Sequence, residues 1–178
     1  TAPSASNTAA LSTQPATKTF CFAKLPESLS ELQALPEASL DSPYKTAALA
    51  VCALCAYAAD TQIGIQMLNW LRGPRPLTGV DISFLNDRFR GGKTYLPFSY
   101  FAGSVPANNY TPAMPFTVNI QSNANSSTEE EYMKLFISCG GADSPRPITL
   151  RRKGDGQWFL WEQYLMTGIQ MPKSADPW

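Results

Sequence analysis

The chain has 178 residues, which is enough for one domain with a substantial hydrophobic core. Its fourteen basic and fourteen acidic residues give a formal net charge of zero. No overall field therefore attracts nucleic acid, and we do not expect nucleic acid as a partner. The sequence contains no histidine, which excludes the commonest general base and the commonest transition-metal ligand. We expect no metal, no cofactor and no catalytic residue.

The N-terminal residues 1–17 are expected to form a spacer-like tail. They contain Ala, Ser, Thr, Gln, Asn and Pro with one Leu and no charge, a composition typical of linkers. A single α+β domain should follow at residues 18–178, beginning with a strand at 20–22. The longest apolar run, residues 47–59, is shorter than the ~20 residues needed to cross a bilayer, so the sequence predicts no membrane span.

Two helices are predicted in the next part of the chain. Ser28 and Glu31 have the spacing of a capping box, and Pro36 ends the helix, so we expect a short helix over 28–35. Ser42 followed by Pro43 is a second start signal. The run of Ala, Leu, Val and Cys behind it is apolar on all sides, which predicts a central, buried helix.

Two further helices complete the first half. Thr61 begins the third helix, and Gly73 with the proline after it closes this helix. Thr78 caps a fourth helix, which the glycine pair 91–92 ends.

Beyond residue 92 the apolar pattern changes to a period of two. Residues 95–110 are rich in Pro, Asn, Gly and aromatics, which predicts a long loop around one extended piece at 98–101. Four strands follow at 116–120, 132–137, 148–153 and 157–162. Helices before strands indicate an α+β fold, in which an N-terminal helical layer packs on a C-terminal antiparallel meander of four or five strands.

The last two strands form a hairpin with unusual side chains. Three cations at 151–153 precede a Gly-Asp-Gly turn, and an aromatic run follows it. A two-residue turn places Arg152 opposite Phe159, whereas a three-residue turn places it opposite Trp158, and the sequence leaves both registers open. Such cations either pack on the aromatic rings or help to hold a ligand, so Arg152, Trp158 and Trp161 are candidate ligand-binding residues.

The aromatic loop is the second candidate binding region. Aromatic rings beside amides are suited to stacking on a sugar or peptide and to hydrogen bonding with it. The alternative is a loop whose rings fix it to the core. The candidate residues are Tyr95, Phe98, Tyr100, Asn108, Asn109 and Tyr110.

Two local motifs indicate ordinary structure. Residues 90–94 (RGGKT) match the end of a phosphate-binding loop, but position 87 is Asp where that motif needs Gly, so we interpret the segment as a turn that ends a helix. Cys52 and Cys55 lie within an apolar helix and are expected to be buried, inert thiols. A Cys21–Cys139 disulfide is the pairing to test if the protein is exported.

Several segments together resemble a known family. They are residues 25–32 (LPESLSEL), 44–49 (YKTAAL), 67–74 (MLNWLRGP), 97–101 (PFSYF), 108–112 (NNYTP) and 151–161 (RRKGDGQWFLW). The family comprises small proteins with a domain of unknown function from gut-dwelling, clostridia-type bacteria, and the resemblance covers roughly residues 18–178. It implies no activity, cofactor or catalytic residue.

We therefore expect a non-catalytic binding or protein-interaction module, with a protein or a small ligand as its partner. The alternative is a hydrolase that uses carboxylates in the aromatic-lined cleft, which requires two carboxylates facing each other in one pocket. The cytoplasm is the expected compartment. The alternative is export or surface anchoring through the N-terminal spacer.

Overall fold

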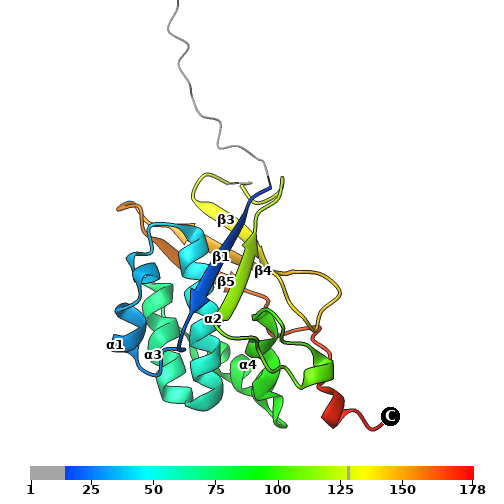
Figure 1. The fold of residues 1–178 in the computed structure, drawn as a ribbon. Helices are drawn as coiled ribbons and strands as arrows, with labels where there is room; N and C mark the ends of the chain where they lie inside the picture. The colour runs from blue at the N-terminus through cyan, green and yellow to red at the C-terminus, as the bar shows by residue number, and fades with distance from the viewer. Residues whose placement is uncertain (1–14, 128) are drawn as a thin grey trace, which may run out of the picture.

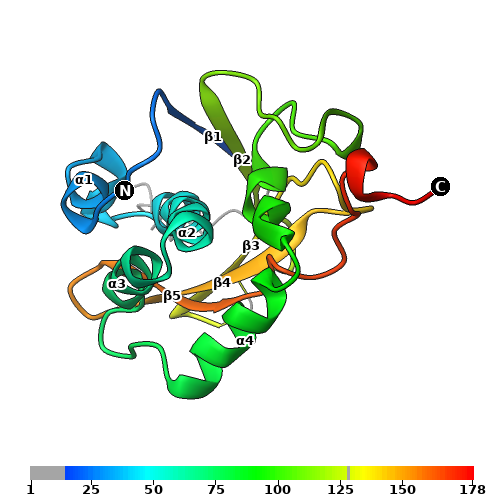
Figure 2. The same ribbon diagram turned by 90° about the horizontal axis from the view of Figure 1, so that it is seen from below.

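The computed structural model describes residues 15–127 and 129–178. Most of the predicted tail lies outside this part of the chain, and Thr17 is the first residue of a strand. One antiparallel sheet, with strand order β1-β2-β3-β4-β5, carries the helices α2 and α3 on one face (Figures 1 and 2). The helices are α1 (Leu29–Gln33), α2 (Pro43–Ala59), α3 (Thr61–Arg72) and α4 (Gly79–Phe89). The strands are β1 (Thr17–Phe22), β2 (Phe116–Gln121), β3 (Tyr132–Ile137), β4 (Arg146–Arg152) and β5 (Trp158–Gln163).

Helix α2 is the centre of the core, as its sequence predicts. Ser42 accepts a hydrogen bond from the Tyr44 amide at 3.3 Å, and 13 of the 17 helical residues are buried. At Gly64 of α3 a Cβ atom would lie 2.3 Å from the Tyr57 Cα atom. The missing side chain therefore lets α2 and α3 approach closely. No helix of the described residues is long and apolar enough to cross a membrane.

The helix boundaries follow the capping signals. The Ser28 hydroxyl accepts from the Glu31 amide at 3.2 Å at the start of α1. Thr78 and Asp81 form a reciprocal capping box at the start of α4. Gly73 ends α3 with a φ of 61°, a conformation that favours glycine. The four predicted helices are confirmed, and the segment after α4 is the predicted turn, because residues 91 and 92 are glycines with positive φ.

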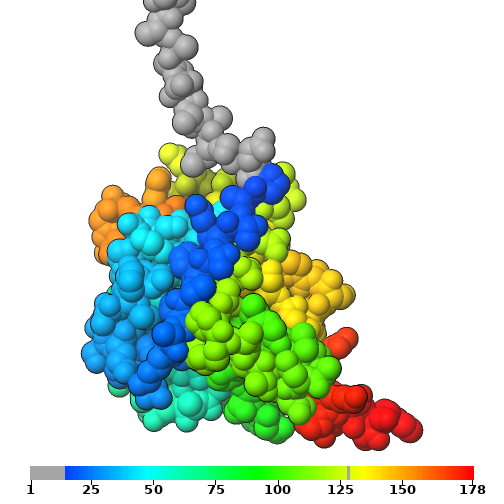
Figure 3. Space-filling model, in the orientation of Figure 1, coloured from blue at the N-terminus to red at the C-terminus, as the bar shows by residue number. Residues whose placement is uncertain are grey.

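The sheet has five strands, and one of them precedes the helices. The last four form the predicted meander, while β1 pairs antiparallel with β2 at the sheet edge. In Figures 1 and 3, β1 crosses the surface in dark blue beside β2. The α+β class is therefore confirmed, with the sheet drawing its edge strand from the N-terminal part of the described chain.

The predicted extended piece at 98–101 is wrong. The segment Lys93–Tyr100 forms a 3-10 helix, and only Phe101 makes a bridge, to Val118 of β2. Its rings at 95, 98 and 101 recur every three residues, which is the period of a 3-10 helix. The alternation of Phe98, Ser99 and Tyr100 suggested a strand, but it extends over only three residues.

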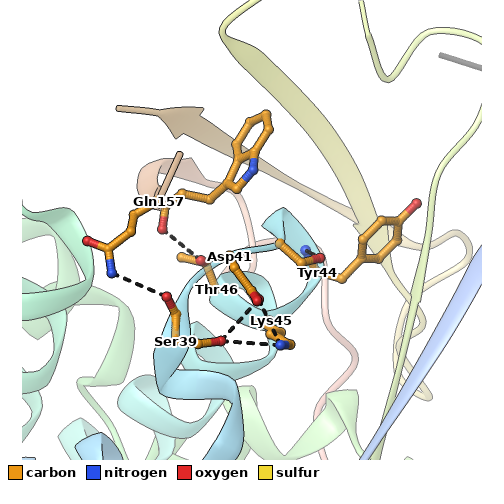
Figure 4. Close-up of polar contacts among 8 residues, drawn as sticks. Ser39, Asp41, Tyr44, Lys45, Thr46 and Gln157 are labelled. Atoms are coloured by element: carbon orange, nitrogen blue, oxygen red, sulfur yellow. Dashed lines mark hydrogen bonds and ion pairs between the residues drawn. The ribbon is translucent and has the colours of Figure 1, made fainter. Parts of the chain in front are cut away.

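Side chains and backbone of the helical layer cover the outer edge of β5. The Trp158 amide donates to the Leu40 carbonyl at 2.8 Å, and the Thr46 hydroxyl donates to the Trp158 carbonyl at 2.8 Å. Figure 4 shows the latter bond beside a hydrogen bond that the side-chain amide of Gln157 donates to the Ser39 carbonyl at 3.2 Å. Further along the strand, Arg75 donates to the Trp161 carbonyl. These contacts satisfy polar groups that an exposed edge strand would offer to another chain.

Candidate functional site

The tyrosine rings of the aromatic loop pack and form hydrogen bonds within the fold. Tyr95 stacks on Tyr110 with ring centres 5.2 Å apart and planes within 5° of each other. The Tyr100 hydroxyl donates to the Leu165 carbonyl, and the Tyr110 hydroxyl donates to the Gln170 carbonyl. Burial raises the pKa of Tyr100 far above its usual range and raises the pKa of Tyr110 to about 12.

The side-chain amides of the two asparagines in this loop also form hydrogen bonds within the fold. The side-chain oxygen Oδ1 of Asn108 accepts from the backbone amides of Val105 and Thr111, both at 3.1 Å. The side-chain nitrogen Nδ2 of Asn108 donates to the Gly103 carbonyl at 2.7 Å. The Asn109 side chain accepts from the Ser174 amide at 3.1 Å. The asparagines therefore hold the loop in shape and attach the C-terminal residues to it.

The loop candidates do not converge on one hollow. Tyr100 borders a hollow of about 210 Å³ that residues 100–105, Asn119 and residues 138–140 line. Phe98 borders a different, largely apolar hollow of about 450 Å³ under the segment that follows β1. No carboxylate lines the 210 Å³ hollow beside Tyr100, whereas the 450 Å³ hollow beside Phe98 has two among its lining residues, Glu27 and Asp60.

The hairpin has the three-residue turn, because Arg152 lies opposite Trp158 in the register of β4 and β5. The Lys153 amide donates to the Gln157 carbonyl at 2.8 Å, which leaves residues 154–156 as the turn. The Arg152 guanidinium lies 5.9 Å from the Trp158 ring centre. This is the last pair before the turn, and Trp158 is half-buried and packs against the core.

Two guanidinium groups lie over the Trp161 ring. The Arg75 carbon atom Cζ is 3.7 Å from the ring centre, and that of Arg151 is 4.8 Å from it. Tyr132 of β3 meets the same indole edge-on, with ring centres 5.5 Å apart. Arg151 follows the buried Leu150, so the cluster lies on the face of the sheet away from the core.

These residues border a hollow of about 380 Å³, which we call the cation hollow. Five of the chain's fourteen basic residues line it, against one of its fourteen acidic residues. A chain without net charge thus concentrates positive charge at one place on its surface. The lining residues are Arg72, Pro74, Arg75, Glu131, Arg151, Arg152, Lys153, Gly154, Phe159, Leu160 and Trp161.

Some of these cations have partners and others keep free donors. Arg72 donates from Nε to the Arg75 carbonyl at 2.9 Å and lies 3.5 Å from Asp81. Burial, followed by the neighbouring Arg75, lowers the pKa of the Arg72 guanidinium. Arg151 forms an ion pair with Glu131 at 3.7 Å. Arg75 uses one terminal nitrogen for the Trp161 carbonyl, and its buried Nε has no partner. Because Nε is closed to solvent, an anion in the hollow would reach Arg75 through its other terminal nitrogen.

The structure brings Arg152 and Trp161 together at the cation hollow, whereas Trp158 and the loop candidates lie elsewhere. Sequence reasoning missed Arg72, which is the last residue of α3, and Arg75, which the segment after α3 carries to the edge of β5. Gly73 permits this route, because a Cβ atom there would lie 2.6 Å from the Phe159 ring. A helix that ends in glycine and proline and is then followed by an arginine was the available signal.

The two cysteines of α2 are buried and offer no reactive group. Burial raises the pKa of the Cys52 and Cys55 thiols, as expected for the interior of α2. Cys21 and Cys139 are free thiols with separate neighbours, the hydroxyls of Thr117 at 3.6 Å and Ser99 at 3.2 Å. The Cys21–Cys139 bond is thus not formed. Within residues 15–127 and 129–178, no three Cys, Asp or Glu side chains are grouped to hold a metal ion.

The fold and the site define a class: a small α+β domain with a cation-lined hollow at the edge of its antiparallel sheet, where the end of α3 meets β5. A model of a domain of unknown function, DUF6935, matches residues 24–173, so the chain belongs to this family. No curated protein and no solved structure matches the chain.

Proposed function

We propose that this chain is a non-catalytic binding module whose ligand carries an anionic group held in the cation hollow. The carrying observation is that five basic side chains line the cation hollow, with the guanidinium groups of Arg75 and Arg151 held over the Trp161 ring. A guanidinium that stacks on a ring keeps its in-plane N–H groups for other partners. Those donors match the two oxygens of a carboxylate or phosphate.

Trp161 serves here as a support for the arginines. Its two neighbouring guanidinium groups lie 3.7 and 4.8 Å from the ring centre, and Tyr132 approaches it edge-on. A base or sugar would need an open ring face to stack on. The indole instead holds the cations in position, so the selectivity we propose is for charge.

The dimensions favour a small ligand or a short acidic segment of a protein. About 380 Å³ lies within the range of small-molecule sites. Nucleic acid is not proposed, because duplex or single-strand binding needs many basic contacts along an extended surface, and the chain as a whole has no net charge.

The first test is calorimetric titration with inorganic phosphate and with citrate at low salt. Arg75→Gln should weaken binding about tenfold or more, because a charge-assisted hydrogen bond contributes ~1.5–3 kcal/mol. Arg90→Gln is the matched control, since Arg90 is an exposed arginine that pairs with Asp87 outside the hollow. Equal affinity in wild type and Arg75→Gln would contradict the proposal.

A hydrolase is the second candidate, and one observation favours it. Glu129 and Glu162 both border a hollow of about 330 Å³ beside Tyr132 and Trp161. Two carboxylates in one hollow are the minimum for acid–base cleavage of a glycosidic bond. Turnover of a glycoside that both Glu129→Gln and Glu162→Gln abolish would support this candidate, whereas no turnover across a glycoside panel would remove it.

We propose the cytoplasm as the compartment, for which the four free thiols are the support. The origin of the family in gut clostridia-type bacteria also stays a prediction.

A further inference from the structure

A second hollow adjoins the cation hollow and has a different character. It has a volume of about 380 Å³ and shares Arg72, Arg75, Leu160 and Trp161 with its neighbour. Buried leucines from α2, α3 and α4 contribute to its lining: Leu54, Leu68 and Leu85. The two hollows therefore meet at the arginine that has the unpartnered Nε.

Exposed apolar side chains surround this second hollow. Val80 and Phe84 of α4 are 79% and 43% exposed, and Tyr164, after β5, is 50% exposed. Val80 and Phe84 are four residues apart, so they lie on one face of α4. Seven large hydrophobic side chains are exposed in the part of the chain described, and these three gather at one hollow. A cluster of this kind marks a binding surface more often than isolated exposure does.

The charged side chains around the second hollow favour an anion at the end that it shares with the cation hollow. Asp81 lies 3.5 Å from Arg72, and Glu162 accepts a hydrogen bond from the Tyr164 hydroxyl at 3.0 Å. Both acids thus have partners on the rim. The Arg88 guanidinium lies 5.0 Å from the Phe84 ring centre, which adds a cation beside the exposed ring. Arg75 is the cation common to the two hollows.

We propose that the ligand is a monomeric anionic amphiphile, with a carboxylate or phosphate head on Arg75 and an alkyl body against Val80 and Phe84. This inference rests on the proposed function and extends it by adding the apolar half of the ligand. Charge complementarity fixes the head, and the exposed apolar face of α4 receives the body. Asp81 and Glu162 on the rim oppose close contact with an extended anionic surface, which favours a single molecule over a membrane.

The experiment is a series of straight-chain carboxylates from acetate to decanoate, titrated below the concentrations at which they form micelles. Affinity should rise with each buried methylene by up to about fourfold, because one buried CH₂ contributes ~0.8 kcal/mol. Octyl phosphate beside octanoate distinguishes the two head groups. Arg75→Gln should weaken every member of the series by about the same factor.

Phe84→Ser should remove most of the chain-length dependence while acetate and phosphate bind as before. Met171→Ser is the matched control, because Met171 is 51% exposed at a place outside both hollows. Neither substituted side chain is buried, so both variants should fold, and circular dichroism checks this.

The outcomes separate the two proposals. If phosphate and acetate bind through Arg75 but affinity is flat along the series, the amphiphile is overturned and the anion-binding function stands. If neither a short nor a long anion binds, both are overturned. Unchanged chain-length dependence in Phe84→Ser, or binding to vesicles of anionic lipid without binding to monomers, would also overturn the amphiphile.

Discussion

The aromatic loop and the cation hollow contain similar residue types and use them in opposite ways. In the loop, the Tyr100 and Tyr110 hydroxyls donate to backbone carbonyls of the C-terminal segment. In the hollow, the guanidinium groups of Arg75 and Arg151 lie over the Trp161 ring. The loop thus satisfies most of its polar groups internally, with the buried Ser104 hydroxyl as an exception, whereas the hollow gathers five basic side chains against one acidic side chain. Aromatic and polar composition therefore does not distinguish a binding site from a packed loop, but the inventory of hydrogen-bond partners does.

The largest expected effect on stability comes from adding one methyl group at Gly140, which packs against the loop. Gly140→Ala would place a Cβ atom 1.9 Å from the Ser104 carbonyl oxygen. This backbone cannot yield easily, so we expect a loss of about 2–3 kcal/mol in the free energy of unfolding. At Gly154, in the hairpin beside the hollow, an added Cβ atom would have no neighbour within 4 Å, so Gly154→Ala should change the free energy of unfolding by less than about 0.5 kcal/mol. Urea denaturation measures both, and equal effects would remove the contrast.

Tyr100→Phe should destabilise the fold by about 1–3 kcal/mol, because the Leu165 carbonyl would lose its partner in the interior. Affinity for phosphate should stay unchanged, since the loop lies outside the cation hollow. Tyr164→Phe is the control, because its hydroxyl bonds to an exposed glutamate. Thermal and chemical denaturation should separate the two variants. A loss of phosphate affinity in Tyr100→Phe would mean that the two regions are coupled.

Alkaline pH should act on the loop. Burial raises the pKa of Tyr110 to about 12 in the folded state, above the ordinary tyrosine value of 10.0. Between these values the unfolded chain releases the proton first, so stability is fully present below pH 10 and falls as the pH rises toward 12. Absorbance of tyrosinate should show that Tyr110→Phe lacks one late, unfolding-linked ionisation. Full ionisation of all seven tyrosines near pH 10 in the folded protein would contradict this.

Trp161→Leu tests the hollow from its centre. The substitution removes the ring over which the guanidinium groups of Arg75 and Arg151 lie, and each lost cation–π contact costs ~0.5–1 kcal/mol. We expect about 1 kcal/mol of destabilisation together with a clear loss of phosphate affinity, because the guanidinium groups lose their support. Calorimetry and denaturation on the same sample measure both quantities. Unaltered affinity would show that the indole does not position the arginines.

Arg152→Gln should have the smallest effect. Arg152 is exposed, and its guanidinium is 5.9 Å from the Trp158 ring centre. Its removal should change stability by less than about 0.5 kcal/mol. Phosphate affinity should fall only slightly and mainly at low salt, where a surface charge still acts over a distance. A loss as large as that of Arg75→Gln would assign the ligand to the hairpin tip.

Local signals predicted much of this fold. Ser42, Thr78 and Gly73 marked helix ends that the structure confirms, because capping depends on residues adjacent in sequence. The strands from β2 to β5 were predicted to within two residues for the same reason. The 3-10 helix at Lys93–Tyr100 was missed, since its rings were interpreted with a period of two.

The site was harder to predict, because its central contact joins distant residues. Trp161 and Arg152 stood out in the hairpin, but Arg75 reaches Trp161 across 86 positions of the chain. Nothing in local periodicity specifies that the segment after α3 passes the edge of β5. The register of the hairpin was also open, and only the structure selects Trp158 as the partner of Arg152.

The contacts made after β5 set the minimum length of a stable domain. Leu165 and Gln170 accept bonds from the two loop tyrosines, and the Gln170 amide donates to the Gly141 carbonyl at 2.8 Å. A chain cut after the last strand would keep the whole sheet yet leave two tyrosine hydroxyls without acceptors. We therefore expect the folding unit to extend through the irregular segment near residue 174, and a fragment that ends with β5 to be less stable.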